Sequence, residues 1–242
     1  MSLPLPYRVL TGPDDSTFCE RVSEALADGY ELHGSPALTF DGDRVIVAQA
    51  ITFPSDRAVV SDYDEGWPAR AQSLISELAS ALGPAASRIE HIGSTAIPGM
   101  AAKDLLDLQI SVSDLDTAAG AFAAPLAELG FERTAFNSDH VPAGSGDDPA
   151  RWAKRFWRRR NHPSGDVNLH VRVVGSPNER LALLFRDWFR AHPAAIPAYA
   201  QFKRVLADNV PDRVAYTDVK DPVVDLVIGA AEQWATATAW RP

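Results

Sequence analysis

Two segments of this 242-residue chain, residues 107–112 and 166–173, alternate without a break between polar and aliphatic side chains. Successive side chains of a β-strand point to opposite faces of a sheet, so each segment predicts a strand with one polar face and one apolar face. The polar faces carry Asp107, Gln109 and Ser111 on the first strand and Asp166, Asn168, His170 and Arg172 on the second. If the two strands are neighbours in one sheet, these faces form a single polar site.

The surrounding patterns predict an α+β domain. A further strand is expected at residues 88–92, and apolar residues that recur three and four positions apart predict amphipathic helices. These helices are expected at residues 67–82, between a capping box at Ser113 and Gly130, and at residues 178–191, 197–207 and 222–240. Because the strands come first and the helices last, we expect a mixed sheet that is covered by helices.

The N-terminal residues predict a separate small module with the order βαββ. Its expected elements are strands at residues 7–10, 37–40 and 44–50 and a helix at residues 13–27. The sequence Asp41-Gly42-Asp43 between the last two strands has the composition of a tight hairpin turn. Residues 52–62 show no clear period and suit a linker. We therefore expect a module at residues 1–57 and a larger domain at residues 58–242.

Composition limits the partners and the compartment that we expect. The formal net charge of −9 argues against nucleic acid as a general partner, because phosphate binding needs a positive field. The single cysteine, Cys19, cannot form an internal disulfide, and the first residues lack the basic start and the apolar stretch of a signal peptide. No apolar run approaches the roughly 20 residues of a membrane helix. We expect a cytoplasmic protein without a membrane span.

A glycine-hydroxyl turn, Gly93-Ser94-Thr95, precedes the first polar strand. Its backbone N–H groups and two hydroxyls suit phosphate oxygens, and a carboxylate on the following strand, Asp107, suits a magnesium ion. Lys103 would then neutralise phosphate charge. The competing interpretation is structural: the glycine makes a turn, the lysine is solvated, and a half-exposed sheet face carries polar residues without any function.

Beyond the turn, five segments belong to a longer pattern. They are His91-Ile92-Gly93-Ser94-Thr95-Ala96-Ile97-Pro98-Gly99-Met100-Ala101-Ala102-Lys103, Leu106-Asp107, Asn168-Leu169-His170-Val171, Phe185-Arg186-Asp187-Trp188 and Tyr216-Thr217-Asp218-Val219-Lys220. Together they resemble the signature of the GrpB family over residues 60–236, which implies a nucleotidyltransferase-like fold. The first fifty-odd residues separately resemble a small bacterial domain of unknown function.

The resemblance also implies a pattern of acidic residues, which this chain matches in part. Active members of the nucleotidyltransferase fold carry two acidic residues, separated by one position, after a glycine-serine turn. Asp107 takes the first position, but the second is Gln109, a much poorer ligand for magnesium. Asp104, which has the opposite strand parity, and Asp166, at the end of the second polar strand, are the other candidate metal ligands. Two-metal nucleotidyl transfer is doubtful with this set.

Two functions follow. In the first, the protein binds a nucleotide or a phosphorylated small molecule and transfers a nucleotidyl group with magnesium; Asp107 holds the ion, and His170 orients or deprotonates the acceptor. The expected phosphate-binding residues are Gly93, Ser94, Thr95, Lys103 and Arg172. In the second, Gln109 marks a catalytically degenerate fold that serves as a binding or regulatory module.

Other residues leave alternatives open. His91 and His170 are candidates for proton transfer or phosphate binding, because histidine titrates near neutrality, and equally for structural roles. Residues 151–160 contain six basic and three aromatic side chains, which suits RNA or phosphate binding and also suits a solvated segment whose aromatic rings pack on the core. The sequence contains no Gly-Lys-Ser or Gly-Lys-Thr, which argues against a P-loop kinase.

Overall fold

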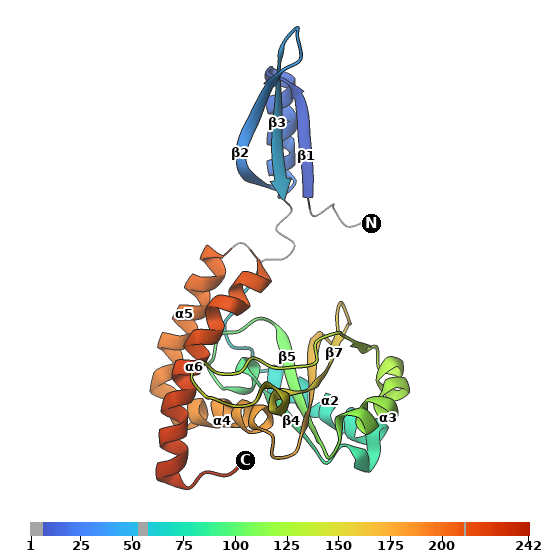
Figure 1. Cartoon of the computed structure of the whole chain (residues 1–242), viewed down its shortest axis with the longest axis vertical. Helices are drawn as coiled ribbons and strands as arrows, with labels where there is room; N and C mark the ends of the chain where they lie inside the picture. The colour runs from blue at the N-terminus through green and yellow to red at the C-terminus, as the bar shows by residue number, and fades with distance from the viewer. Residues whose placement is uncertain (1–6, 53–57, 211) are drawn as a thin grey trace. The chain divides into compact units, whose positions relative to one another are not determined.

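Two compact units make up the part of the chain that the computed structural model describes, namely residues 7–52, 58–210 and 212–242 (Figure 1). The first unit comprises residues up to Ala58 with Val210–Tyr216, and the second comprises Val59–Asn209 with Thr217–Pro242. The linker predicted at residues 52–62 includes residues 53–57, which lie outside the described residues. Among the residues described, no helix combines the length and the apolar character that crossing a membrane requires.

The first unit contains the predicted βαββ arrangement. Its elements are β1 (Tyr7–Pro13), α1 (Ser16–Ala27), β2 (Glu31–Phe40) and β3 (Val45–Thr52). β3 lies between β1 and β2 and is antiparallel to both, and the apolar side of α1 packs on this sheet. The strands are longer than predicted. α1 begins at Ser16 rather than at residue 13, because Asp15 caps the helix by accepting the backbone N–H of Phe18.

A mixed sheet of five strands forms the centre of the second unit and confirms the predicted α+β class. In spatial order its strands are β4 (Arg88–Ile92), β5 (Leu105–Val112), β8 (Asp166–Val173), β7 (Arg155–Arg159) and β6 (Glu132–Arg133). The helices are α2 (Trp67–Leu82), α3 (Leu115–Glu128), α4 (Pro177–Ala191), α5 (Ile196–Asn209) and α6 (Arg213–Thr238). β5 and β8 pair in parallel, with Asp107 opposite Asn168 and Gln109 opposite His170. The two alternating segments are therefore neighbours, and their polar faces are continuous.

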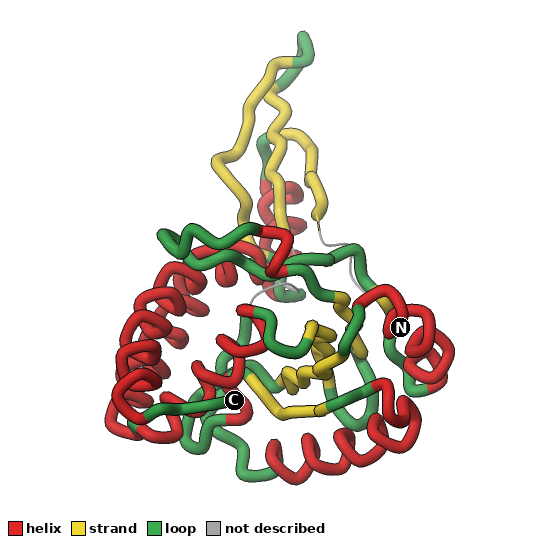
Figure 2. Tube along the Cα trace, turned by 60° about the horizontal axis from the view of Figure 1, so that its bottom comes forward, coloured by secondary structure: helices red, strands yellow, loops and turns green. Residues whose placement is uncertain are grey.

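The two faces of this sheet are covered differently (Figure 2). On the apolar face, Leu74 of α2 and Phe122 of α3 pack with Leu108 of β5 in one continuous core, whose removal from water drives folding. On the polar face, the first turn of α4 brings the carboxylate of Glu179 to the hydroxyl of Ser111 at 2.6 Å. A hydrocarbon core therefore supports the sheet from one side, and charged and amide groups contact it from the other.

Two local predictions are wrong, and one strand was not predicted. Residues Arg155–Arg159 of the basic segment form strand β7, which shows no polar and apolar alternation because arginines occupy both of its faces. α3 is capped by Asp114, whose carboxylate accepts the N–H of Thr117, and not by Ser113. α6 begins at Arg213 and runs through Pro222, which was expected to start it. A proline inside a helix removes one N–H donor, a loss that a long packed helix tolerates.

Candidate functional site

The turn after β4 lies directly against the carboxylate of Asp107. Gly93 has φ 69°, in the left-handed region that favours glycine, and a Cβ at this position would meet Oδ2 of Asp107 at 2.7 Å. Any side chain here would clash with the carboxylate as well as strain the backbone. The glycine therefore lets a short 3₁₀ turn (Ser94–Ala96) begin beside β5.

Thr95 holds this turn from the inside. Its side chain is buried, and its Oγ1 lies 2.9 Å from Nε2 of His91 and 3.4 Å from the carbonyl oxygen of Leu105. Burial lowers the pKa of His91 to about 4; the charge of Asp107 opposes this lowering, and the charges of Arg190 and Arg186 add to it. The hydroxyl that we expected to face a phosphate is engaged within the protein.

Ser94 instead meets a lysine that the sequence did not single out. Lys203 of α5 is 3% exposed, and its Nζ donates to Oγ of Ser94 at 2.9 Å. Burial lowers the pKa of Lys203 to about 7, and the positive charges of Lys220 and Lys103 lower it further. In sequence Lys203 is one polar residue of an amphipathic helix, 109 positions from Ser94, and no local signal relates the two.

Asp107 is ionised and partly accessible. Its Oδ1 accepts the side-chain N–H of Asn168 at 2.8 Å and lies 3.5 Å from Nε2 of His170, while its side chain keeps 27% exposure. Burial raises the pKa of Asp107, but hydrogen bonds from His170 and Asn168 and the charge of Lys103 outweigh this and lower it to about 2. A carboxylate oxygen, Oδ2, thus remains beside the turn at Gly93.

His170 is fixed in one tautomer by its neighbours. Arg172 can act only as a donor and lies 3.2 Å from Nδ1, so the ring proton belongs on Nε2 and points to Asp107. Burial and the nearby charge of Arg172 lower the pKa of His170 to about 4, which keeps the ring neutral at pH 7. Both nitrogens are engaged, so accepting a proton from a substrate would require His170 to release one of these contacts.

Gln109 and Arg172 crosslink the interior of the polar face. Gln109 is fully buried; its amide N–H donates to the backbone carbonyl of Glu179 at 3.2 Å, and its Oε1 accepts from Arg172. Arg172 is itself buried and also donates to both carboxylate oxygens of Asp139, at 2.8 and 3.1 Å. The second acidic position of the expected pattern is therefore a structural link, and Arg172 is not open to a phosphate in this arrangement.

Asp139 is a member of this network that sequence reasoning missed. It enters the polar face from the irregular segment before β7 and accepts hydrogen bonds from Lys154 at 2.6 Å and Asn178 at 3.0 Å as well as from Arg172. Burial raises the pKa of Asp139, but the guanidinium of Arg172 and the ammonium of Lys154 hold it well below its usual range. A carboxylate in a loop has no periodic neighbours, so nothing in the sequence marked it.

The comparison with known families gives two matches. Residues 57–229 match the family model described as GrpB protein. The chain belongs to the GrpB family. Residues 5–53 match the model of a domain of unknown function, DUF1737. Both resemblances expected from the sequence are thereby confirmed.

Curated relatives include two kinds of protein. A dephospho-CoA kinase of Mycolicibacterium paratuberculosis is 37% identical over 196 residues, covering 74% of this chain and 47% of that protein. The UPF0157 protein PA4798 of Pseudomonas aeruginosa is 34% identical over 171 residues, covering 69% of this chain and 65% of that protein. This GrpB chain thus spans about half the length of the dephospho-CoA kinases that it matches.

Among solved structures, GrpB from Enterococcus faecalis aligns with a TM-score of 0.59 and 23% identity, covering 73% of this chain and 99% of that one. A structure of the Cid1 poly(U) polymerase with MgGTP bound aligns with a TM-score of 0.40 and 13% identity, covering 61% of this chain and 43% of that one. The Enterococcus structure shows the GrpB fold of the second unit.

The three carboxylates expected to hold magnesium do not meet in this GrpB chain. Asp104 accepts hydrogen bonds from Trp67 and Arg70, both at 2.8 Å, on the side of the sheet that α2 covers. Asp166 accepts the backbone N–H of Asn161 at 2.8 Å and closes the β7–β8 turn. Within the described residues, no group of three or more histidine, cysteine or acidic side chains is placed to hold a metal. Asp107 alone does not fit a two-metal site.

The basic segment does not form one continuous positive surface. Arg151 is exposed and pairs with Asp147, whereas Lys154 is buried against Asp139. Arg155 pairs with Asp116 and Arg159 is buried on the face packed by α2 and α3. The charges are divided between two sheet faces and are largely compensated by carboxylates. RNA binding through this segment stays a prediction without support from its geometry.

Proposed function

We propose that the GrpB domain of this chain binds the phosphate groups of a nucleotide or phosphorylated small molecule at the turn formed by Gly93 and Ser94. The observation that carries this proposal is the position of Lys203, a buried ammonium that donates to the hydroxyl of Ser94. Among the described residues, no carboxylate forms an ion pair with it. Two further lysines, Lys103 and Lys220, lie close enough to lower its pKa.

Like charges beside a buried ammonium are unfavourable, and the nearby carboxylate of Asp107 offsets this only in part. Burying an ammonium beside like charges disfavours its charged form, which is why the pKa of Lys203 falls to about 7. A phosphate that accepts from both Ser94 and Lys203 would add negative charge to the cluster through charge-assisted hydrogen bonds. The positive charges that destabilise one another in the free protein would then stabilise the complex.

Nucleotidyl transfer is the second candidate, and Asp107 favours it. Its ionised Oδ2 lies beside the turn, and magnesium is often held by one or two carboxylates together with substrate phosphates. Gln109 argues against transfer. Its amide N–H donates to the carbonyl of Glu179 and its amide oxygen accepts from Arg172, so this oxygen is not available to a metal. We therefore propose a binding role in preference to turnover.

The kinase activity in the names of the mycobacterial relatives is not proposed, because this sequence has no Gly-Lys-Ser or Gly-Lys-Thr.

The test is calorimetric titration of the full chain with ATP, GTP, CTP, UTP and pyrophosphate, each with magnesium and with a chelator. We expect binding of at least one of these, weakened about tenfold or more by Lys203→Met, a loss of one charge-assisted hydrogen bond. Arg151→Met is the matched control. It removes one positive charge from an exposed side chain that pairs with Asp147 and not with the turn, so it measures the effect of net charge alone.

Absence of heat with every probe would overturn the phosphate site. Binding that Lys203→Met leaves unchanged would place it elsewhere. Release of pyrophosphate from any triphosphate, abolished by Asp107→Asn, would replace the binding role by transfer.

A further inference from the structure

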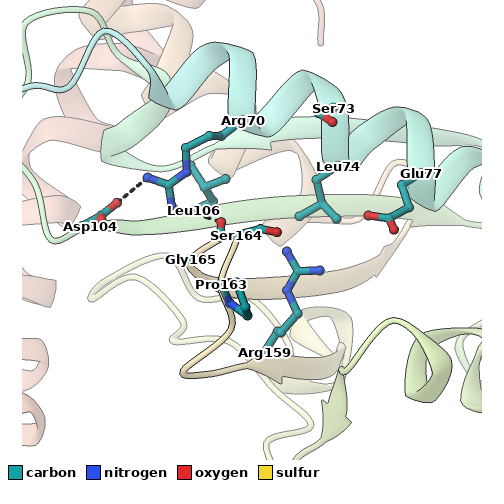
Figure 3. Close-up of a pocket in the computed structure, with 10 residues that line it drawn as sticks. All are labelled: Arg70, Ser73, Leu74, Glu77, Asp104, Leu106, Arg159, Pro163, Ser164 and Gly165. Carbon is teal, nitrogen blue, oxygen red and sulfur yellow. Dashed lines mark hydrogen bonds and ion pairs between the residues drawn. The ribbon is translucent and has the colours of Figure 1, made fainter.

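A cavity lies on the face of the sheet opposite to Asp107. It is open to solvent, has a volume of about 470 Å³ and is lined by α2, the start of β5 and the turn between β7 and β8 (Figure 3). Its walls include Leu74, Leu106 and Pro163. Leu106 points into it, so Asp107, the next residue of the strand, faces away. The volume lies in the range of small-molecule sites, and none of the residues of the phosphate site proposed above lines it.

One wall of this cavity carries a buried arginine whose hydrogen bonds are incomplete. Arg159 is 4% exposed, its Nε has no hydrogen-bond partner, and its Nη1 donates to the carbonyl of Leu129 at a long 3.4 Å. The guanidinium carbon lies 5.0 Å above the ring of Phe131 and reaches toward α2, between Leu74 and Glu77 (Figure 3). In the described part of the chain, no carboxylate lies within ion-pair distance of it.

The other charges at the cavity are already compensated or solvated. Arg70 donates to Asp104 at 2.8 Å and to the carbonyl of Ser164 at 3.4 Å. Glu77 is exposed on α2 and opposes the lowering of the Arg159 pKa that burial causes, without touching the guanidinium. An arginine stays charged in proteins, so Arg159 is a buried cation that lacks a contacting anion.

We propose that this cavity binds a small molecule through a carboxylate or phosphate group that pairs with Arg159. The planar guanidinium presents parallel N–H groups that match two oxygens of such an anion. Leu74, Leu106 and Pro163 would pack against the apolar part of the ligand, and the solvent-exposed Glu77 would bound the entrance. This site is separate from the turn at Gly93 and does not depend on the function proposed for it.

The experiment observes Arg159 directly. In the full chain labelled with ¹⁵N, the arginine Nε–Hε signal of Arg159 is assigned by its loss in Arg159→Lys and followed while succinate or inorganic phosphate is added. We expect a saturable shift with at least one probe; a response to succinate alone identifies a carboxylate site, and a response to phosphate alone a phosphate site. Lys203→Met should leave this shift unchanged, which separates the cavity from the phosphate site at the turn.

Two variants keep the test decisive if Arg159→Lys folds poorly. Glu77→Gln removes a competing charge from an exposed helix position and should tighten probe binding about two- to fivefold, the effect of a partly screened charge. Ser73→Asp adds a negative charge on the same wall and should weaken binding by a similar factor. A signal of Arg159 that does not move at millimolar concentrations of either probe overturns the proposal, as does binding that neither variant changes.

Discussion

The polar face of β5 has an open end at Asp107 and a closed end at Gln109. The two differ in whether their hydrogen-bonding groups already have partners within the protein. At Asp107 the carboxylate keeps 27% exposure and faces a turn with a lysine cluster, whereas two residues along the same strand Gln109 is fully buried and bonded on both sides. Both side chains are polar and lie on the same face of the strand. Their difference lies in whether other elements have already satisfied them, and an open end is where a ligand finds unused hydrogen-bonding capacity.

The largest difference between the ends is expected in stability. Arg172→Met leaves the buried carboxylate of Asp139 with one fewer cation and Gln109 without its donor, and should lower the free energy of unfolding by about 3–5 kcal/mol. Asp107→Asn at the open end should lower it by less, about 1–2.5 kcal/mol, because the ionised carboxylate gains hydrogen bonds that lower its pKa to about 2. Urea unfolding of both variants measures the contrast. Equal losses would show that the two ends are not distinct.

Gly93→Ala tests the close contact between the turn and the carboxylate of Asp107. The substitution combines a left-handed φ with a Cβ placed 2.7 Å from Oδ2 of Asp107, and should cost about 1–3 kcal/mol. Asp107→Ser in the same chain removes the contact with Oδ2 but keeps the Cβ at 3.0 Å and the backbone strain, so the double variant should recover part of the loss. A double-mutant cycle from urea unfolding measures this recovery, and purely additive effects would contradict the contact.

Gln109→Glu restores the expected acidic pattern without restoring a site. A carboxylate cannot donate to the carbonyl of Glu179, so the bond from residue 109 is lost and two oxygens face each other, at a cost of about 1–3 kcal/mol. We expect no magnesium binding and no turnover, as measured by calorimetry and pyrophosphate release. Gln109→Met is the control that removes the amide without adding charge. Tight magnesium binding by Gln109→Glu would contradict this expectation, because residue 109 would then have to leave its contacts with Glu179 and Arg172.

At neutral pH the smallest effect is expected from His91, because its titration changes stability only below about pH 6.5. Its folded pKa of about 4 lies below its ordinary value of 6.5, so between these values the unfolded chain binds more protons. The free energy of unfolding therefore falls as the pH falls from about 6.5 to 4. His91→Gln should make this fall shallower. Identical dependence of the unfolding free energy on pH in His91→Gln and the unmodified chain would contradict a lowered pKa of His91.

Sequence alternation was sufficient to predict a polar and an apolar face for β5 and for β8, because side-chain direction in a strand is a short-range property. It did not predict that the two strands pair, which brings Asp107 opposite Asn168. Lys203, Asp139 and Glu179 reach the site from distant segments, and neither periodicity nor spacing relates them to it. The distinction between Gln109 as a failed ligand and Gln109 as a crosslink likewise depends on which groups pack against it in three dimensions.

The missing side chain at Gly93 has a thermodynamic consequence. Because nothing separates the turn from Asp107, a phosphate held there would lie next to an ionised carboxylate, and each negative charge would weaken the other. Phosphate binding would then be coupled to uptake of a proton or a cation, and by reciprocity any cation bound at Asp107 would raise phosphate affinity. Because Gly93 has no Cβ, phosphate binding at the turn and cation binding at Asp107 are thermodynamically linked.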